Sequence, residues 1–266
     1  MNKILAAMGI VLMPVAGLAL SSFIPAKSVM ANAVEIKVLS ADVLTPVLKS
    51  LVSEFEHTTN HKVTLVLATT GVVSDRVQSG EVADVAIMQR PALGKLAEQG
   101  RIVAASMTDL GRSSVAVGVR AGAPKPDLTS VEAFRRALLA AKLIGYMDPG
   151  RGGGSGVYFA KLVERLGLAD QLKPKTRYPQ PGHSAADLIA EGEIDFGIAQ
   201  PMEILARPGI ELVGSLPPEL QNFGLFVFSA GILQNAREPE AARALIQFFS
   251  GAVAAAAIKA KGMDPG

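Results

Sequence analysis

The chain has no cysteine and no tryptophan, and only three histidines among its 266 residues. The lack of cysteine excludes disulfide bonds, thiolate metal sites and a lipid anchor attached to a cysteine. No Gly-x-Ser-x-Gly sequence, typical of hydrolases with a serine nucleophile, is present. His57 and His61 flank one turn and are predicted to be solvated, which leaves His183 as the one histidine considered for a site. We expect no metal and no cofactor.

The N-terminus has the pattern of a secretory signal peptide. Lys3 is followed by an uncharged apolar run over residues 4–26 and then by Ala31-Asn32-Ala33, a small-x-small cleavage pattern. An uncleaved membrane anchor is the alternative, because the run is long enough to cross a hydrocarbon core. We predict a signal peptide over residues 1–33, cleavage near Ala33 and a periplasmic or otherwise extracytoplasmic location.

Cleavage changes the charge of the protein. Residues 1–33 contain two lysines and no acidic residue, so the formal net charge falls from +2 to 0. A neutral chain without a run of Lys or Arg gives no electrostatic footprint for nucleic acid. The remaining length is large enough to fold by burial of apolar side chains alone.

Short β-rich runs alternate with amphipathic helices from Val34 onward, a pattern typical of an α/β protein with mainly parallel sheets. A polar Pro/Gly segment, residues 121–127, separates two such series. The predicted strands are 34–39, 62–68, 82–88, 114–119, 143–146, 175–178, 194–199 and 224–229. The predicted helices are 46–57, 72–78, 92–99, 130–140, 156–165, 185–191 and 239–250, with an alanine-rich stretch over 252–260.

Two lobes account for this order of elements. Residues 34–119 and 230–266 are predicted to form a discontinuous first lobe, and residues 120–229 a second lobe. Each lobe is expected to contain a mainly parallel sheet flanked by helices.

The candidate ligand-binding residues lie in strand-to-helix turns, because ligands of open α/β sheets bind beyond the carboxyl ends of the strands. Small hydroxyl and glycine residues at a helix N-terminus let an anion approach unpaired N–H groups. Each such turn also fits an ordinary helix cap. The candidates from these turns are Ser40, Asp42, Thr69, Thr70, Gly71, Gly154, Ser155, Gly156 and Gln200.

Two further candidates carry side chains suited to an anion. Arg151 lies inside the glycine run 150–156, where a guanidinium could clamp a carboxylate or oxyanion; a solvated loop arginine is the alternative. His183 precedes a predicted helix and could face the same cleft or be an ordinary loop residue. The glycine run lacks the spacing of a dinucleotide or phosphate-binding loop, which argues against nucleotide binding.

Several segments carry a family resemblance. They are Gly80-Glu-Val-Ala-Asp-Val-Ala-Ile87, Asp148-Pro149 with Ser155-Gly156-Val-Tyr-Phe-Ala-Lys161, Leu166-Gly-Leu168, Gly192-Glu-Ile-Asp-Phe-Gly-Ile198 and Lys261-Gly262-Met263. In this order they resemble the molybdate-binding branch of the type II periplasmic binding proteins, from about Glu35 to the C-terminus. The resemblance implies the two-lobed type II fold, a small anionic ligand held between the lobes, an ABC-type permease as partner, and a monomer.

The ligand positions depart from that family's pattern. The resemblance implies a serine where Val43 stands, with Asp42 beside it, and a tyrosine where Gln200 stands. A carboxylate beside a desolvated dianion is repulsive, which argues against molybdate itself. The expected ligand is a small anion, either a molybdate-like oxyanion or a small carboxylate. The alternative function is that of similar aconitate-isomerase-like relatives, which would interconvert cis- and trans-aconitate, with Asp42 or His183 as the catalytic base.

Overall fold

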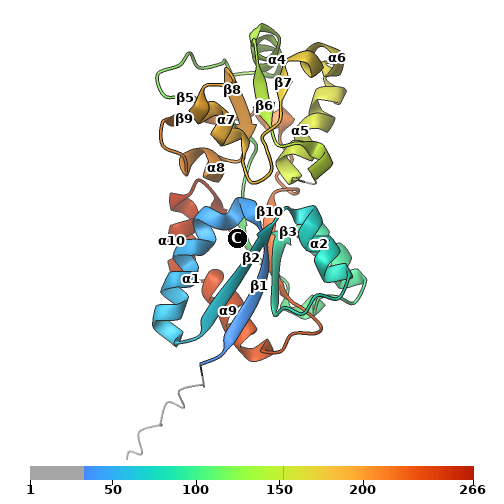
Figure 1. Cartoon of the computed structure of the whole chain (residues 1–266), viewed down its shortest axis with the longest axis vertical. Coiled ribbons are helices and arrows are strands. Elements are labelled where there is room, and N and C mark those ends of the chain that lie inside the picture. The colour runs from blue at the N-terminus through green and yellow to red at the C-terminus, as the bar shows by residue number, and fades with distance from the viewer. Residues whose placement is uncertain (1–32, 152) are drawn as a thin grey trace, which may run out of the picture. The chain divides into compact units, whose positions relative to one another are not determined.

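The computed structural model describes residues 33–151 and 153–266 (Figure 1). The signal peptide predicted over residues 1–33 lies outside the described residues, apart from Ala33. The described chain contains two sheets, each with its own helices. We call the six-stranded sheet with the helices that pack on it the first lobe, and the five-stranded sheet with its helices the second lobe.

The first sheet has the strand order β11-β4-β10-β3-β1-β2. Only β1 with β2 and β1 with β3 are parallel, and the other three pairs are antiparallel. The sheet is therefore mixed, not mainly parallel as the sequence suggested. Its elements are β1 (Glu35–Ala41), β2 (Lys62–Ala68), β3 (Val85–Gln89), β4 (Thr108–Arg112), β10 (Val227–Ile232), β11 (Asp264–Pro265), α1 (Thr45–Thr59), α2 (Thr70–Gln78), α3 (Arg90–Glu98), α9 (Pro239–Phe249) and α10 (Ala252–Ala260).

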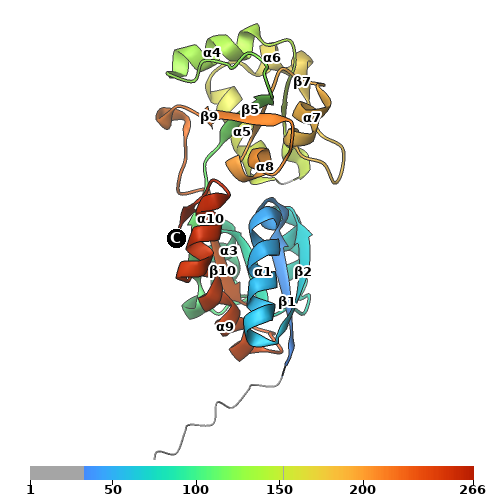
Figure 2. The ribbon, with the colours of Figure 1, turned by 90° about the vertical axis from the view of Figure 1, so that its left-hand side faces the viewer.

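Alternating side chains bury both faces of the first sheet. On β3, Val85 and Ile87 join the core beneath α1, α9 and α10, whereas Ala86 and Met88 join the core beneath α2 and α3. This period of two is the geometry of an extended strand. Figure 2 shows α1, α9 and α10 grouped on one side of this sheet. β3 is buried along its whole length because both faces of the sheet are covered there.

The second sheet has the order β7-β6-β8-β5-β9. It is also mixed, because β6 pairs in parallel with β7 and β8 whereas β5 pairs antiparallel with β8 and β9. Its elements are β5 (Ala116–Arg120), β6 (Ile144–Tyr146), β7 (Thr176–Arg177), β8 (Phe196–Ala199), β9 (Ile210–Ser215), α4 (Val131–Ala140), α5 (Gly154–Arg165), α6 (Ala169–Leu172), α7 (Ala185–Glu191) and α8 (Pro201–Leu205).

A row of glycines brings α7 close to the second sheet. Gly118, Gly197 and Gly145 are register partners on the neighbouring strands β5, β8 and β6. A Cβ atom at position 197 would lie 2.8 Å from Ile189 Cδ1 on α7, closer than packed carbon atoms approach. The missing side chains let α7 settle on the sheet, and this fixes the loop that carries His183 at the start of that helix.

The predicted lobe limits, 119/120 and 229/230, assigned most of β5 to the first lobe and the first half of β10 to the second. The structure places each of these strands in the other lobe. β5 hydrogen-bonds in the second sheet and β10 in the first. The chain therefore crosses between the sheets within residues 113–115 and 216–226, several residues earlier in each case. Apolar alternation predicted that both strands exist, but it carries no information about their partners.

Helix α8 follows a strand of the second sheet but also contributes to the core of the first lobe. Met202 is fully buried in the cluster that contains Leu44, Val47 and Met263. Pro201 and Leu205 pack against Gly262, and α8 contacts η1 (Asp42–Leu44) and α1. One short helix thus ties the two lobes together beside the turn that follows β1.

Helices α9 and α10 are consecutive apolar helices near the C-terminus. Within residues 33–151 and 153–266, neither these nor any other single helix is long and apolar enough to span a membrane, although α9 and α10 together, bent by 57°, meet that test. Both helices contribute buried side chains to the first-lobe core.

The aspartate of the Gly-x-x-Ala-Asp-Val motif has a structural role. Asp84 is buried, and its carboxylate accepts the backbone N–H groups of Lys37 at 2.8 Å, Arg237 at 2.8 Å and Glu238 at 2.9 Å. These bonds join β1, the start of β3 and the entry to α9. His61 is also buried, contrary to the prediction of a solvated side chain, because its Nδ1 accepts the N–H of Val34 and its ring stacks on Phe55.

Candidate functional site

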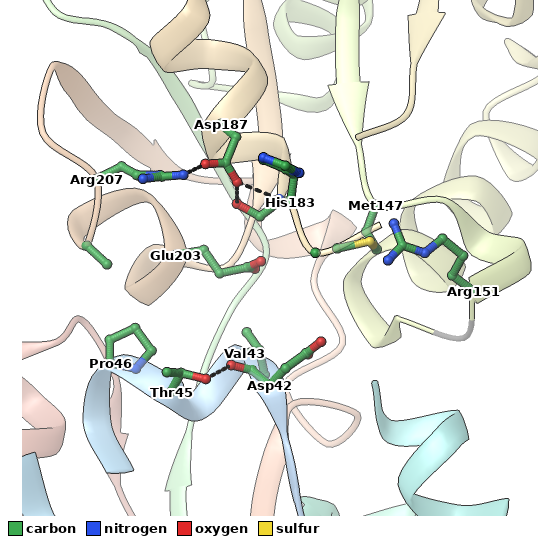
Figure 3. Close-up of a pocket in the computed structure, with 13 residues that line it drawn as sticks. Asp42, Val43, Thr45, Pro46, Met147, Arg151, His183, Asp187, Glu203 and Arg207 are labelled. Carbon is green, nitrogen blue, oxygen red and sulfur yellow. Dashed lines mark hydrogen bonds and ion pairs between the residues drawn. The ribbon is translucent and has the colours of Figure 1, made fainter. Parts of the chain in front are cut away.

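A cavity of about 380 Å³ lies where turns from both lobes meet. The first lobe contributes η1 and the start of α1, and the second lobe contributes the turns that follow β6 and β7, the first turns of α7 and α8, and the residues after α8 (Figure 3). Most of these segments lie at carboxyl ends of strands, as expected for an α/β ligand site. The lining residues are Asp42, Val43, Thr45, Pro46, Met147, Arg151, Gly182, His183, Ser184, Asp187, Glu203, Ala206 and Arg207.

Three of the predicted site residues line this cavity: Asp42, Arg151 and His183. The guanidinium of Arg151 donates to the carbonyl oxygens of Pro179 at 3.3 Å and Gln180 at 3.2 Å. These bonds hold the side chain against the loop that leads to His183, and the other guanidinium nitrogens have no hydrogen bond within the described residues. An arginine fixed in this way can donate two parallel N–H hydrogen bonds from its guanidinium group to an anionic ligand.

The carboxyl group of Asp42 faces the same cavity (Figure 3). Burial raises the pKa of Asp42, and the hydrogen bond from the Val43 N–H and the positive charge of Arg151 oppose that rise. The hydroxyl of Thr45, another lining residue, donates to the backbone carbonyl of Asp42. The first turn therefore presents a carboxyl group to the ligand space.

Glu203 is a second carboxyl group in the cavity, and the sequence analysis missed it. It lies in the first turn of α8, where its Oε2 accepts the N–H of Gln200 at 2.9 Å. Burial raises the pKa of Glu203 to about 7, and the nearby charge of Asp42 adds to the rise. The spacing Gln200-x-x-Glu203 is a helix-capping pattern and could have drawn attention to this residue.

The third carboxyl group in the cavity wall is engaged by its neighbours. Asp187 accepts the N–H of Ser184 at 2.6 Å and its hydroxyl at 3.1 Å, and it forms an ion pair with Arg207. This arrangement caps α7 and fixes the turn that carries His183. The ionisable side chains facing the cavity are thus those of Asp42, Arg151, His183 and Glu203, together with the paired Asp187 and Arg207.

The candidates from the second turn do not line the cavity, and neither do the glycines and the serine of the glycine run. Thr69 caps α2 by accepting the N–H of Val72 at 3.5 Å, and Gly71 lies within that helix. Thr70 donates to the side-chain oxygen of Gln89, and the Gln89 amide lies against Gly154, where no side chain intervenes. Gln89 is buried at the end of β3, so this polar contact joins α2 and β3 to the start of α5.

The remaining candidates are buried. The Ser40 hydroxyl donates to the Ala41 carbonyl at 3.3 Å, and Ser155 and Gly156 are covered in the first turn of α5. Gln200 is 2% exposed, and its Oε1 has no hydrogen-bond partner within the described residues. The described chain also contains no group of three or more His, Asp or Glu side chains placed to hold a metal ion.

The family model for bacterial extracellular solute-binding proteins matches residues 36–264. The chain belongs to this family. The match begins at β1 and ends at β11, so it covers both sheets and every turn of the cavity. The family resemblance and the two-sheet α/β architecture inferred from the sequence are therefore confirmed.

Curated relatives fall into two functional classes. Aconitate isomerase of Pseudomonas sp is 33% identical over 234 residues, which cover 86% of this chain and 87% of that protein. The molybdate-binding protein ModA of Escherichia coli strain K12 is 25% identical over 206 residues, 77% of this chain and 79% of that protein. The relatives of this chain thus include one named for catalysis and one named for binding.

Solved structures support the fold of this solute-binding protein. The periplasmic molybdate-binding protein of Azotobacter vinelandii has a TM-score of 0.70 and 23% identity, covering 86% of this chain and 98% of that one. The sulfate-binding protein SubI of Mycobacterium tuberculosis H37Rv has a TM-score of 0.70 and 18% identity, with 87% of each chain covered. At these identities the likeness is one of architecture.

Proposed function

We propose that this solute-binding protein captures a small anion with more than one carboxylate group in the cavity formed by the turns after β1, β6, β7 and β8. The main support for this proposal is that cationic Arg151 lines the same cavity as the carboxyl groups of Asp42 and Glu203. Arg151 offers charge-assisted hydrogen bonds to a ligand carboxylate. A compact tetrahedral dianion holds both of its charges at one point beside these two carboxyl groups, whereas a polycarboxylate spreads its charges over several groups, one of which can lie at Arg151.

The proposal also includes a partner, which is supported by the solute-binding family, and export, which is supported by the N-terminal signal pattern. An ABC-type permease receives the ligand from the monomeric, extracytoplasmic protein, with capture by closure of the lobes.

Cleavage near Ala33 starts the mature chain at Val34. The intact mass of the exported protein tests this assignment, and a periplasmic species that retains residues 1–33 would contradict it.

A ligand screen by thermal shift tests the proposed function. The panel is molybdate, tungstate, sulfate, phosphate, citrate, tricarballylate, and cis- and trans-aconitate. We expect tricarboxylates to raise the melting temperature, because a ligand at 100 times its dissociation constant adds about 2.7 kcal/mol to the stability of the folded state. Stabilisation by molybdate and tungstate alone would contradict the carboxylate assignment.

Catalytic interconversion of aconitate isomers is the second candidate function. The 33% identity to aconitate isomerase favours it, as do Asp42 and His183 in the cavity. A base would remove a proton from the methylene carbon of aconitate, the double bond would shift, and a proton would return to the former vinyl carbon.

NMR in deuterated water separates the two candidates. A binding protein returns either aconitate isomer unchanged, whereas an isomerase converts one into the other and introduces deuterium at carbon. Conversion that is lost in Asp42→Asn or His183→Ala would establish the enzyme and overturn simple binding.

A further inference from the structure

We propose that Glu203 takes up a proton when an anion occupies the cavity, so that ligand capture by this protein is coupled to proton binding. This inference rests on the proposed function and adds to it a specificity-determining residue. It assigns to Glu203 a role that the sequence pattern did not indicate.

Glu203 is one of the residues that line the ligand cavity. Glu203 lies on α8, which packs against η1, so its carboxyl group shares one cavity with that of Asp42 (Figure 3). One oxygen of Glu203, Oε2, is occupied by the N–H of Gln200. The other oxygen, Oε1, has no hydrogen bond within the described residues and can carry a proton toward the ligand.

Charged and titratable side chains from several elements surround Glu203. Asp42 lies in η1 and Arg151 in η3 (Pro149–Arg151). His183 lies in the turn before α7, Asp187 lies in the first turn of α7, and Arg207 follows α8. Arg207 is paired with Asp187, and Arg151 is held at the carbonyls of residues 179 and 180. No cation among the described residues forms an ion pair with Glu203.

The direction of the coupling follows from Coulomb's law. The free protein already holds the pKa of Glu203 at about 7, chiefly through burial. An incoming carboxylate adds negative charge at short range, which favours the protonated carboxyl group further. The neutral Glu203 can then donate its O–H to the ligand, whereas ionised Glu203 repels it. The affinity should therefore fall as the pH rises above about 7, by up to tenfold for each pH unit.

The test is calorimetric titration of the mature protein with tricarballylate, a saturated tricarboxylate that has no double bond to isomerise. Titrations at pH 8 in buffers of different ionisation enthalpy give the number of protons taken up for each ligand bound. We expect up to about one proton for the wild-type protein and almost none for Glu203→Gln, whose amide oxygen can still accept the N–H of Gln200. The affinity of Glu203→Gln should vary little between pH 6 and pH 8.

Two further variants identify the group that takes up the proton. His183→Ala should retain the proton uptake, and Asp42→Asn should move the pH dependence of affinity to lower pH, because the neighbouring charge is removed. Binding without proton uptake, or uptake that is lost in His183→Ala and kept in Glu203→Gln, would overturn the inference while leaving carboxylate capture intact. Failure of every carboxylate in the panel to bind would overturn both proposals.

Discussion

Replacing Asp84 with alanine is expected to lower the free energy of unfolding by about 2–4 kcal/mol, the range for loss of a buried hydrogen-bond network. The carboxylate of Asp84 accepts three backbone N–H groups from two distant segments, at Lys37 and at residues 237–238. Alanine removes all three acceptor contacts at once. Urea denaturation followed by circular dichroism measures the change.

Two variants serve as controls for Asp84. Asp84→Asn retains one acceptor oxygen and should lose only part of the stability. Asp75→Ala removes an exposed carboxylate on α2 and should change the unfolding free energy by less than about 0.5 kcal/mol. Equal stabilities for Asp84→Ala and Asp75→Ala would show that the carboxylate of Asp84 does not hold β1 and α9 together.

Replacing Gly156 with alanine should destabilise the second lobe by about 1–3 kcal/mol or more. The added Cβ would overlap the backbone carbonyl oxygen of Met147, and a backbone atom cannot rotate away as a side chain does. The start of α5 would have to move, and with it the turn that carries Arg151. Thermal unfolding measures the loss.

Gly94→Ala is the matched control for Gly156, because Gly94 lies within α3 and a Cβ there meets no atom within 4 Å. Alanine at 94 should raise the unfolding free energy by about 0.4–1 kcal/mol, since it restricts the unfolded chain. If Gly156→Ala were as stable as Gly94→Ala, the close approach of α5 to Met147 would not be needed.

Most elements of the fold could be predicted from local sequence, because buried strands and amphipathic helices leave clear periodicities. The expected limits of Lys62–Ala68 and Ala185–Glu191 match β2 and α7 at both ends. Strand β4, with the sequence Thr-Asp-Leu-Gly-Arg, was missed because its polar side chains look like a loop. Its Asp109 accepts the Ser229 hydroxyl of β10 at 2.6 Å, and only the fold brings that partner near.

The candidate site could be predicted in part. Asp42, Arg151 and His183 line one cavity, because the turns after β1, β6 and β7 lie at carboxyl ends of strands, where ligands of α/β sheets bind. Thr70 and Gly154 could not be assigned from sequence, since both meet at Gln89, a residue with no motif of its own. Glu203 was missed because only Gln200, directly after β8, was considered as a ligand contact in that turn. Glu203, which lines the cavity, lies three residues further on in the first turn of α8.

Calorimetric titration of tricarballylate and of molybdate into three proteins tests most directly the claim that this cavity captures a carboxylate anion. The proteins are the wild type, Arg151→Ala and Arg177→Ala; Arg177 is an exposed arginine of β7 that does not line the cavity. Loss of charge-assisted hydrogen bonds costs about 1.5–3 kcal/mol, so Arg151→Ala should bind tricarballylate roughly 10- to 150-fold more weakly, and Arg177→Ala should bind like the wild type. Equal affinities of all three proteins for tricarballylate, or tight molybdate binding without tricarballylate binding, would contradict the claim.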